Sequence, residues 1–125
     1  MSADKITIGL TPESRKVMAR LTERDWFETQ IDAAKFAMAF AITRNVAPGS
    51  PDKAETVWNT GSFDDDGTLR TIVPALYPGT EHPYKLVEHF INAGLTLIDQ
   101  ELSMGGNLSL TQLMERANPK QETLL

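Results

Sequence analysis

The hydrophobic pattern is most continuous between Phe27 and Arg44, where the sequence reads FETQIDAAKFAMAFAITR. Between Ala33 and Ile42 only Lys35 is polar, and no Gly or Pro interrupts the alanines, which are the strongest helix formers. The segment is too long for an ordinary strand, so the pattern predicts a helix. A helix that is apolar on nearly every side is typical of a protein core, and we expect the rest of the chain to pack around this one.

Local signals mark both ends of this central helix. Asp25 and Thr29 are each followed three residues later by an acidic residue, so either of them could begin the helix as a capping residue. Pro48 and Gly49 indicate that the helix has ended before them.

A second long helix is predicted between Pro83 and Met104. Its apolar residues recur at steps of three or four, which places them on one face of the helix. This face is formed by Tyr84, Val87, Ile91, Leu95, Ile98 and Leu102. Gly94 lies within this stripe, where glycine costs about 1 kcal/mol relative to alanine, so we expect a close helix crossing there. The alanines of the central helix are the expected partners, and the two long helices should cross in the core.

Apolar and other side chains alternate along residues 5–10, which predicts a short, half-buried strand. The inner side of this strand would hold Ile6, Ile8 and Leu10, and the outer side Lys5, Thr7 and Gly9. Thr11 and Pro12 are a strong helix-start signal, because threonine caps a helix and proline fits its first turn.

The helix that starts there should run to about Leu21, with Val17 and Met18 also buried. Its other side is basic, and holds Arg15, Lys16 and Arg20. A short link then leads into the central helix.

The middle of the chain, residues 46–65, is rich in Pro, Gly, Ser and charged residues, and we expect a surface loop that Trp58 anchors to the body. Asp65 or Asp66 would then cap a short helix. The apolar residues of that helix are Leu69, Ile72, Val73 and Leu76.

A last short helix is predicted to begin at Asn107 or Ser109 and to end near Ala117. These elements predict a mainly α fold, a single helical domain over residues 1–125 with about five helices and one short N-terminal strand. The strand and the first two helices would occupy residues 5–45, the loop 46–65, and the other helices 66–117. The tail 118–125 is expected to fray.

Composition and charge exclude several classes of function for this chain. The chain has 125 residues and a formal net charge of −5, with about +1 on residues 1–45 and −6 on residues 46–125. Broad binding to nucleic acid is therefore disfavoured, although a local basic face near the N-terminus stays open. The absence of cysteine excludes disulfides, thiolate metal sites and cysteine nucleophiles. With no signal-peptide pattern and no apolar run of membrane-spanning length, we expect a soluble cytoplasmic protein that does not contact a membrane.

Two groups of residues invite a metal-binding interpretation, and neither supports it. His82 and His89 are seven residues apart on one helix face, but His82 lies at the helix start and the chain offers no further dedicated ligands. Residues 64–67 read DDDG, like the start of a calcium loop, but the twelfth position is Ala75 instead of glutamate. The chain also contains no recognised catalytic motif. We therefore expect no enzyme activity, no catalytic residues, no cofactor and no bound metal.

The order strand, helix, short link, helix resembles the ribbon-helix-helix proteins, in which two chains pair their strands and the outward strand residues read the major groove. In that alternative the DNA-binding residues would be Lys5, Thr7, Arg15 and Lys16. The other interpretation is a single strand that packs on its own helical domain. Because we predict no second strand later in the chain, we expect residues 5–11 to pair with their copy in a homodimer.

Three segments together resemble a family of small proteins encoded with bacterial DNA phosphorothioation (Dnd-type) and related phage-defence clusters. The segments are FETQIDAAKFAMAFAI, TVWNTGSFDDDGTLRTIVPALYPG and PYKLVEHFINAGLTLIDQEL, which span about residues 27–102. The resemblance implies a non-enzymatic accessory protein that binds larger protein partners, enzymes and ATPases that act on DNA. It implies no catalytic residues.

Overall fold

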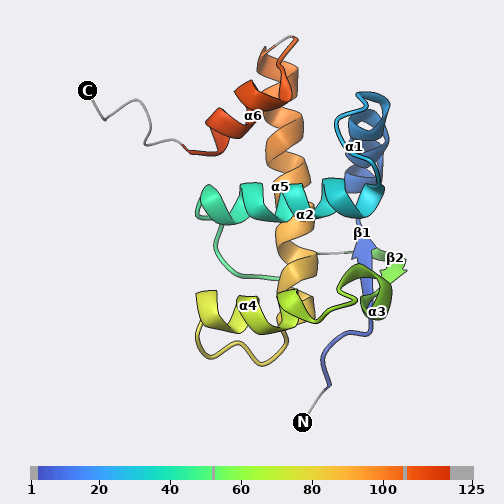
Figure 1. Cartoon of the computed structure of the whole chain (residues 1–125), viewed down its shortest axis with the longest axis vertical. Coiled ribbons are helices and arrows are strands. Elements are labelled where there is room, and N and C mark those ends of the chain that lie inside the picture. Colours follow the sequence, from blue (N-terminus) through green and yellow to red (C-terminus); the bar gives the residue numbers. More distant parts are fainter. Residues whose placement is uncertain (1–2, 52, 106, 119–125) are drawn as a thin grey trace, which may run out of the picture.

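Two long helices cross at the centre of the molecule, α2 (Gln30–Thr43) and α5 (Pro83–Gly105) (Figure 1). The computed structural model describes residues 3–51, 53–105 and 107–118. At the crossing, a Cβ atom added to Gly94 would lie 1.8 Å from the carbonyl oxygen of Ala37. The α5 backbone therefore rests directly on the α2 backbone, which confirms the predicted crossing of Gly94 over the central alanines.

The central helix begins later than Phe27. Of the two predicted caps, Thr29 is the one used, and its side chain accepts a hydrogen bond from Asp32 N at 3.0 Å. Asp25 instead has a left-handed backbone (φ 61°) in the turn before the helix. The inward-facing alanines of α2 are 0% exposed, so the prediction of a core helix is confirmed.

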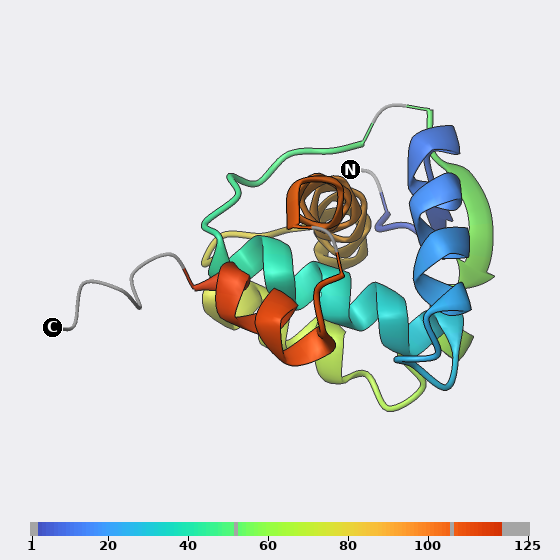
Figure 2. The same cartoon turned by 90° about the horizontal axis from the view of Figure 1, so that it is seen from above.

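The first helix, α1 (Pro12–Glu23), agrees with its prediction. The Thr11 side chain accepts a hydrogen bond from Ser14 N at 3.1 Å and caps the helix. The buried residues of α1 include Val17, Met18 and Leu21, whereas Arg15, Lys16 and Arg20 are exposed. Figure 2 shows α5 nearly end-on, with α2 passing on one side of it and the segment between α2 and the sheet passing on the other.

The strand β1 (Thr7–Leu10) pairs antiparallel with a second strand of the same chain, β2 (Glu55–Asn59). The prediction that no later segment forms a strand is therefore wrong, and residues 46–65 are not all loop, because the short helix α3 (Thr60–Phe63) follows β2. The sequence signal of β2 is weak, since only Val57 and Trp58 of its five residues are half buried and the others are exposed. The side chain of Trp58 nevertheless packs against the core, as predicted.

Two details of β1 also differ from the prediction. Ile6 lies outside the strand and is 78% exposed, although Ile8 and Leu10 are buried at 0% and 2% exposure. Gly9 does not face outward: the register shifts between Ile8 and Gly9, and a Cβ atom on Gly9 would lie 2.7 Å from Glu55 O. The β2 backbone occupies the space of a side chain there, so glycine fits a close approach of the two strands.

The helix α4 (Thr68–Leu76) is capped mainly by Asp64, whereas the predicted caps were Asp65 and Asp66. The carboxylate of Asp64 accepts hydrogen bonds from Leu69 N and Arg70 N, both at 3.0 Å. Asp66 adds a bond from Thr68 N at 3.0 Å, while Asp65 is exposed. The predicted apolar side of α4 is also split, because its residues Leu69 and Val73 are buried but Ile72 and Leu76 are 44% and 54% exposed.

The last helix, α6 (Leu110–Ala117), starts with a capping box between Ser109 and Gln112, so Ser109 is the cap rather than Asn107. Glu101 on α5 links α6 to the core helices, because its carboxylate forms ion pairs with Arg116 of α6 at 3.0 Å and with Arg44, the residue after α2, at 3.3 Å. The mainly α fold with a short N-terminal strand is confirmed, with α3 and β2 as the additional elements in the described residues. Most of the predicted tail, residues 119–125, lies outside the described residues.

We predict that Gly94→Ala destabilises the protein by about 3 kcal/mol or more, because the new methyl group would overlap the α2 backbone, which cannot move aside as a side chain could. Urea denaturation measures the change. Gly61→Ala is the matched control: its Cβ atom would come no closer than 3.5 Å to Asn59 Oδ1, so its effect should stay within about 0.5 kcal/mol. Equal stability losses in the two variants would contradict the backbone crossing.

Candidate functional site

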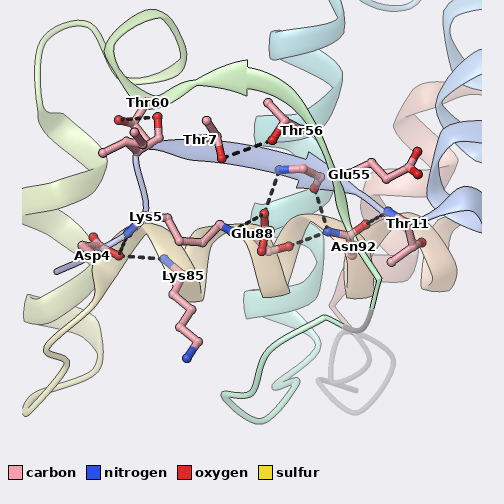
Figure 3. A network of polar contacts seen from close by, with 12 residues as sticks. Asp4, Lys5, Thr7, Thr11, Glu55, Thr56, Thr60, Lys85, Glu88 and Asn92 are labelled. Carbon is pink, nitrogen blue, oxygen red and sulfur yellow. Dashed lines mark hydrogen bonds and ion pairs between the residues drawn. The ribbon is translucent and has the colours of Figure 1, made fainter. Parts of the chain in front are cut away.

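Polar side chains on one flank of α5 hold the N-terminal segment along the helix (Figure 3). At the start of α5, the carboxylate of Asp4 accepts hydrogen bonds from Tyr84 N at 2.8 Å and Lys85 N at 3.2 Å. These amides have no partner within the helix, and a side-chain oxygen that accepts from them acts as a cap. The cap of the longest helix is thus supplied by a residue about eighty positions earlier in the chain.

Farther along the same flank, Glu88 and Asn92 bind the backbone of β1. The Glu88 carboxylate accepts a hydrogen bond from Gly9 N at 2.8 Å and forms an ion pair with Lys5 Nζ at 3.4 Å. The Asn92 amide accepts from Thr11 N at 2.9 Å and donates to Gly9 O at 3.1 Å. Glu88 and Asn92 are only 5% and 6% exposed, so these bonds satisfy groups that water cannot reach.

Both edges of β1 are consequently used within one chain, by β2 on one side and by the α5 side chains on the other. This arrangement differs from the predicted pairing of residues 5–11 with their copy, and its physical reason is the presence of β2. A homodimer stays a prediction, but it would have to use another surface.

The structure does not bring the four predicted DNA-contact residues to one exposed face. Lys5 is paired with Glu88 on the α5 side, and the Thr7 hydroxyl binds that of Thr56 at 3.3 Å. Arg15 donates to the carbonyl oxygens of residues 55 and 56 in β2, at 3.2 and 3.3 Å. Lys16 is exposed on α1, at the seam with α5.

His89 and the aspartate cluster have structural partners. Nε2 of His89 donates to Ala47 O at 2.8 Å, which holds the segment after α2 against α5. Asp64 is 5% exposed and also accepts a hydrogen bond from the Tyr84 hydroxyl at 2.8 Å. Among the residues that the structure describes, no group of three or more His, Cys, Asp or Glu side chains is placed to hold a metal ion.

Two ionisable groups near this cluster have shifted pKa values. Burial is the main reason that the pKa of Tyr84 lies above its ordinary value, and the hydrogen bond to Asp64 and the charge of Asp64 raise it further. The pKa of Asp66 is lowered, mainly because the backbone and the hydroxyl of Thr68 donate to its carboxylate.

Sequence reasoning missed the roles of Asp4, Glu88 and Asn92. A signal was present in α5: an acid and an amide four residues apart lie on one flank of a stripe that is otherwise apolar. Polar residues so close to a core face need partners, and unpaired strand groups are the natural ones. The pattern alone does not identify the distant segment that supplies them.

The exposed residues of α4 include unusually few charged side chains for a surface helix. Six of its residues are exposed, and the only charged one among them is Arg70. In α1, by contrast, five of the seven exposed residues are charged. Two large apolar side chains, Ile72 and Leu76, stand one turn apart, and the exposed residues beside them, Thr68, Thr71 and Ala75, carry no charge. We refer to these five residues, without Arg70, as the uncharged face of α4.

Comparison of the chain with protein-family models, with curated proteins and with solved structures finds no match. In the described part of the chain, no helix is both long and apolar enough to span a membrane.

We predict that Asn92→Asp costs about 2–3 kcal/mol of folding free energy, because a carboxylate in place of the amide loses both donated bonds and faces the carbonyl oxygens of Gly9 and Glu88. Asn107→Asp makes the same chemical change at an exposed site and should alter stability by less than about 0.5 kcal/mol. Urea denaturation at neutral pH compares the two variants, and similar small effects would contradict a structural role for Asn92.

We also predict a loss of stability at alkaline pH that depends on Tyr84. A pKa that is higher in the folded state favours the neutral phenol, so its contribution is complete below the unfolded value near 10 and is lost as the pH rises through the folded value. Tyr84→Phe should lower stability at pH 7 by removing the bond to Asp64, but should reduce the fall in stability between about pH 9 and 11, where the phenol of the unfolded chain ionises. Urea denaturation across this pH range measures both effects; an unchanged fall in the variant would contradict the prediction. Burial also raises the pKa of Tyr77, so Tyr77→Phe measures how much of the alkaline loss of stability comes from this second tyrosine.

Proposed function

We propose that the protein is a non-enzymatic accessory protein that binds larger protein partners in a bacterial DNA-modification or phage-defence system. The uncharged exposed face of α4 is the observation that carries the protein-binding part of this proposal. The resemblance of residues 27–102 to small proteins of DNA phosphorothioation clusters supports the choice of system.

The argument from α4 is energetic. Ile72 and Leu76 keep about half of their surface in water, and their transfer into an interface is favourable by about 25 cal/mol for each Å² of apolar area buried. The surrounding exposed residues Thr68, Thr71 and Ala75 add no charge that a partner would have to desolvate. Depletion of charge around apolar anchors is typical of the centre of a protein interface.

The ribbon-helix-helix alternative has less support. A ribbon needs a free strand edge, whereas β1 uses one edge for β2 and the other for Glu88 and Asn92. Two of the expected reading residues, Lys5 and Thr7, are already paired inside the chain.

Affinity purification from the native host tests the proposal. We expect the wild-type protein to capture large enzyme or ATPase subunits that act on DNA, and Ile72→Glu together with Leu76→Glu to abolish capture, because two buried charges would remain unpaired in the interface. Met104→Glu is the control: Met104 is 77% exposed at the C-terminal end of α5, whereas α4 lies beside the N-terminal part of α5 (Figure 1), so this variant should leave capture unchanged.

Thermal denaturation shows whether the α4 variants remain folded. Recovery of specific DNA fragments without protein partners, or equal capture by folded wild-type and α4 variants, would contradict the proposal.

A further inference from the structure

A line of basic side chains follows the seam between α1 and α5. Lys16 and Arg20 lie one turn apart on the same face of α1, and Arg24, the residue that caps the C-terminal end of α1, continues this line. All three are exposed. The α5 side of the seam is formed by Thr96, Asp99, Leu102 and Ser103. Because successive turns of both helices meet in the same order, α1 and α5 run in the same direction here, as Figure 1 shows.

The surface is hollowed along this seam. One hollow of about 700 Å³ lies between Lys16 and Thr96 and is also lined by Lys53, Glu13 and the start of α1. A second hollow of about 440 Å³ lies one turn farther along and is lined by Arg20, Arg24, Asp99, Leu102 and Ser103. The ion pair between Arg20 and Asp99, with a distance of 2.6 Å, crosses the seam. We refer to the two hollows together as the α1/α5 groove.

The charge of the α1/α5 groove is opposite to that of the whole chain. Its lining holds four basic side chains, Lys16, Lys53, Arg20 and Arg24, and two acidic ones, Glu13 and Asp99. The sum is +2, whereas the chain carries −5. A local positive groove on a negative protein attracts an acidic ligand, and the negative surface outside the groove repels the same ligand.

From this groove we infer a second contact for the protein partner of the proposed function: the groove binds an acidic segment whose carboxylates are about 6 Å apart, the rise over four residues of a helix. That spacing matches the rise between successive members of the Lys16, Arg20 and Arg24 line. A guanidinium group can bind a carboxylate with two parallel hydrogen bonds, so Arg24 would fix the position of the segment. Arg20 already donates to Asp99 through Nη2 and would contribute only its remaining N–H groups, and Lys16 would add a point charge. This inference rests on the proposed function for the nature of the partner.

The observations favour a protein segment over a nucleic-acid strand. The basic line is only about 12 Å long, which a few acidic residues can cover. None of the described residues that line the two hollows is aromatic, and the nearby ring of Trp26 lies under the Arg24 guanidinium, 5.1 Å from the ring centroid. Single-strand binding sites instead stack bases on open aromatic side chains.

Fluorescence anisotropy with labelled probes tests the inference on the full-length protein. The probes are an alanine-based helical peptide with glutamate at every fourth position, the same peptide with glutamine, and an oligothymidine strand. We expect the glutamate peptide to bind and the glutamine peptide not to bind. The double variant Lys16→Gln, Arg24→Gln should weaken binding of the glutamate peptide about tenfold, and added salt should weaken wild-type binding.

The matched control carries Lys85→Gln and Arg70→Gln, two exposed basic residues outside the groove, and makes the same change in net charge. It should alter the affinity for the peptide by less than about twofold. Equal weakening in the two variants, equal binding of both peptides, or tighter binding of oligothymidine would overturn the inference.

These outcomes are distinct from a failure of the proposed function. A protein that captures its partners through α4 but does not bind the glutamate peptide would retain the proposed function and lose the acidic-segment site. A protein that binds the peptide but captures no protein from its host would retain the acidic-segment site and lose the proposed function.

Discussion

The contact between Gly94 and the backbone of Ala37 is the constraint on which the rest of the structure depends. A crossing without a side chain between the helices lets α5 lie close enough to α2 for both apolar faces to be buried in one core. The positions of the remaining elements then follow from the side chains on the other faces of α5. The α4 helix and α1 pack on its apolar sides, and the N-terminal segment binds its polar flank.

The polar flank explains why the N-terminal strand needs no second chain. Strand edges are normally satisfied by another strand, but here Glu88 and Asn92 perform that role on one edge and β2 performs it on the other. The buried polar groups of this region are therefore committed to the fold. The surfaces that stay open to partners are of two different kinds, the uncharged face of α4 and the basic α1/α5 groove, and they lie on different parts of the molecule (Figure 1).

Strong local signals made most of the fold predictable. The alanine-rich helix, the stripe of α5, and the caps Thr11 and Ser109 depend on periodicity and on residues a few positions apart. The strand β2, the cap of α5 by Asp4, and the roles of Glu88 and Asn92 depend on segments that are far apart in sequence. A single sequence carries no such pairing information, so the partners of β1 and the exposed face of α4 became evident only in the structure.

The pairing of β1 with β2 inside one chain can be tested directly, because the chain has no native cysteine. The hydroxyls of Thr7 and Thr56 are 3.3 Å apart, so the side chains at these two positions contact each other across the two strands. Thr7→Cys together with Thr56→Cys, oxidised and analysed by non-reducing electrophoresis, should give a cross-linked monomer at all protein concentrations. Disulfide-linked dimers as the main product would show that the strand pairs with another chain and would contradict the intramolecular sheet.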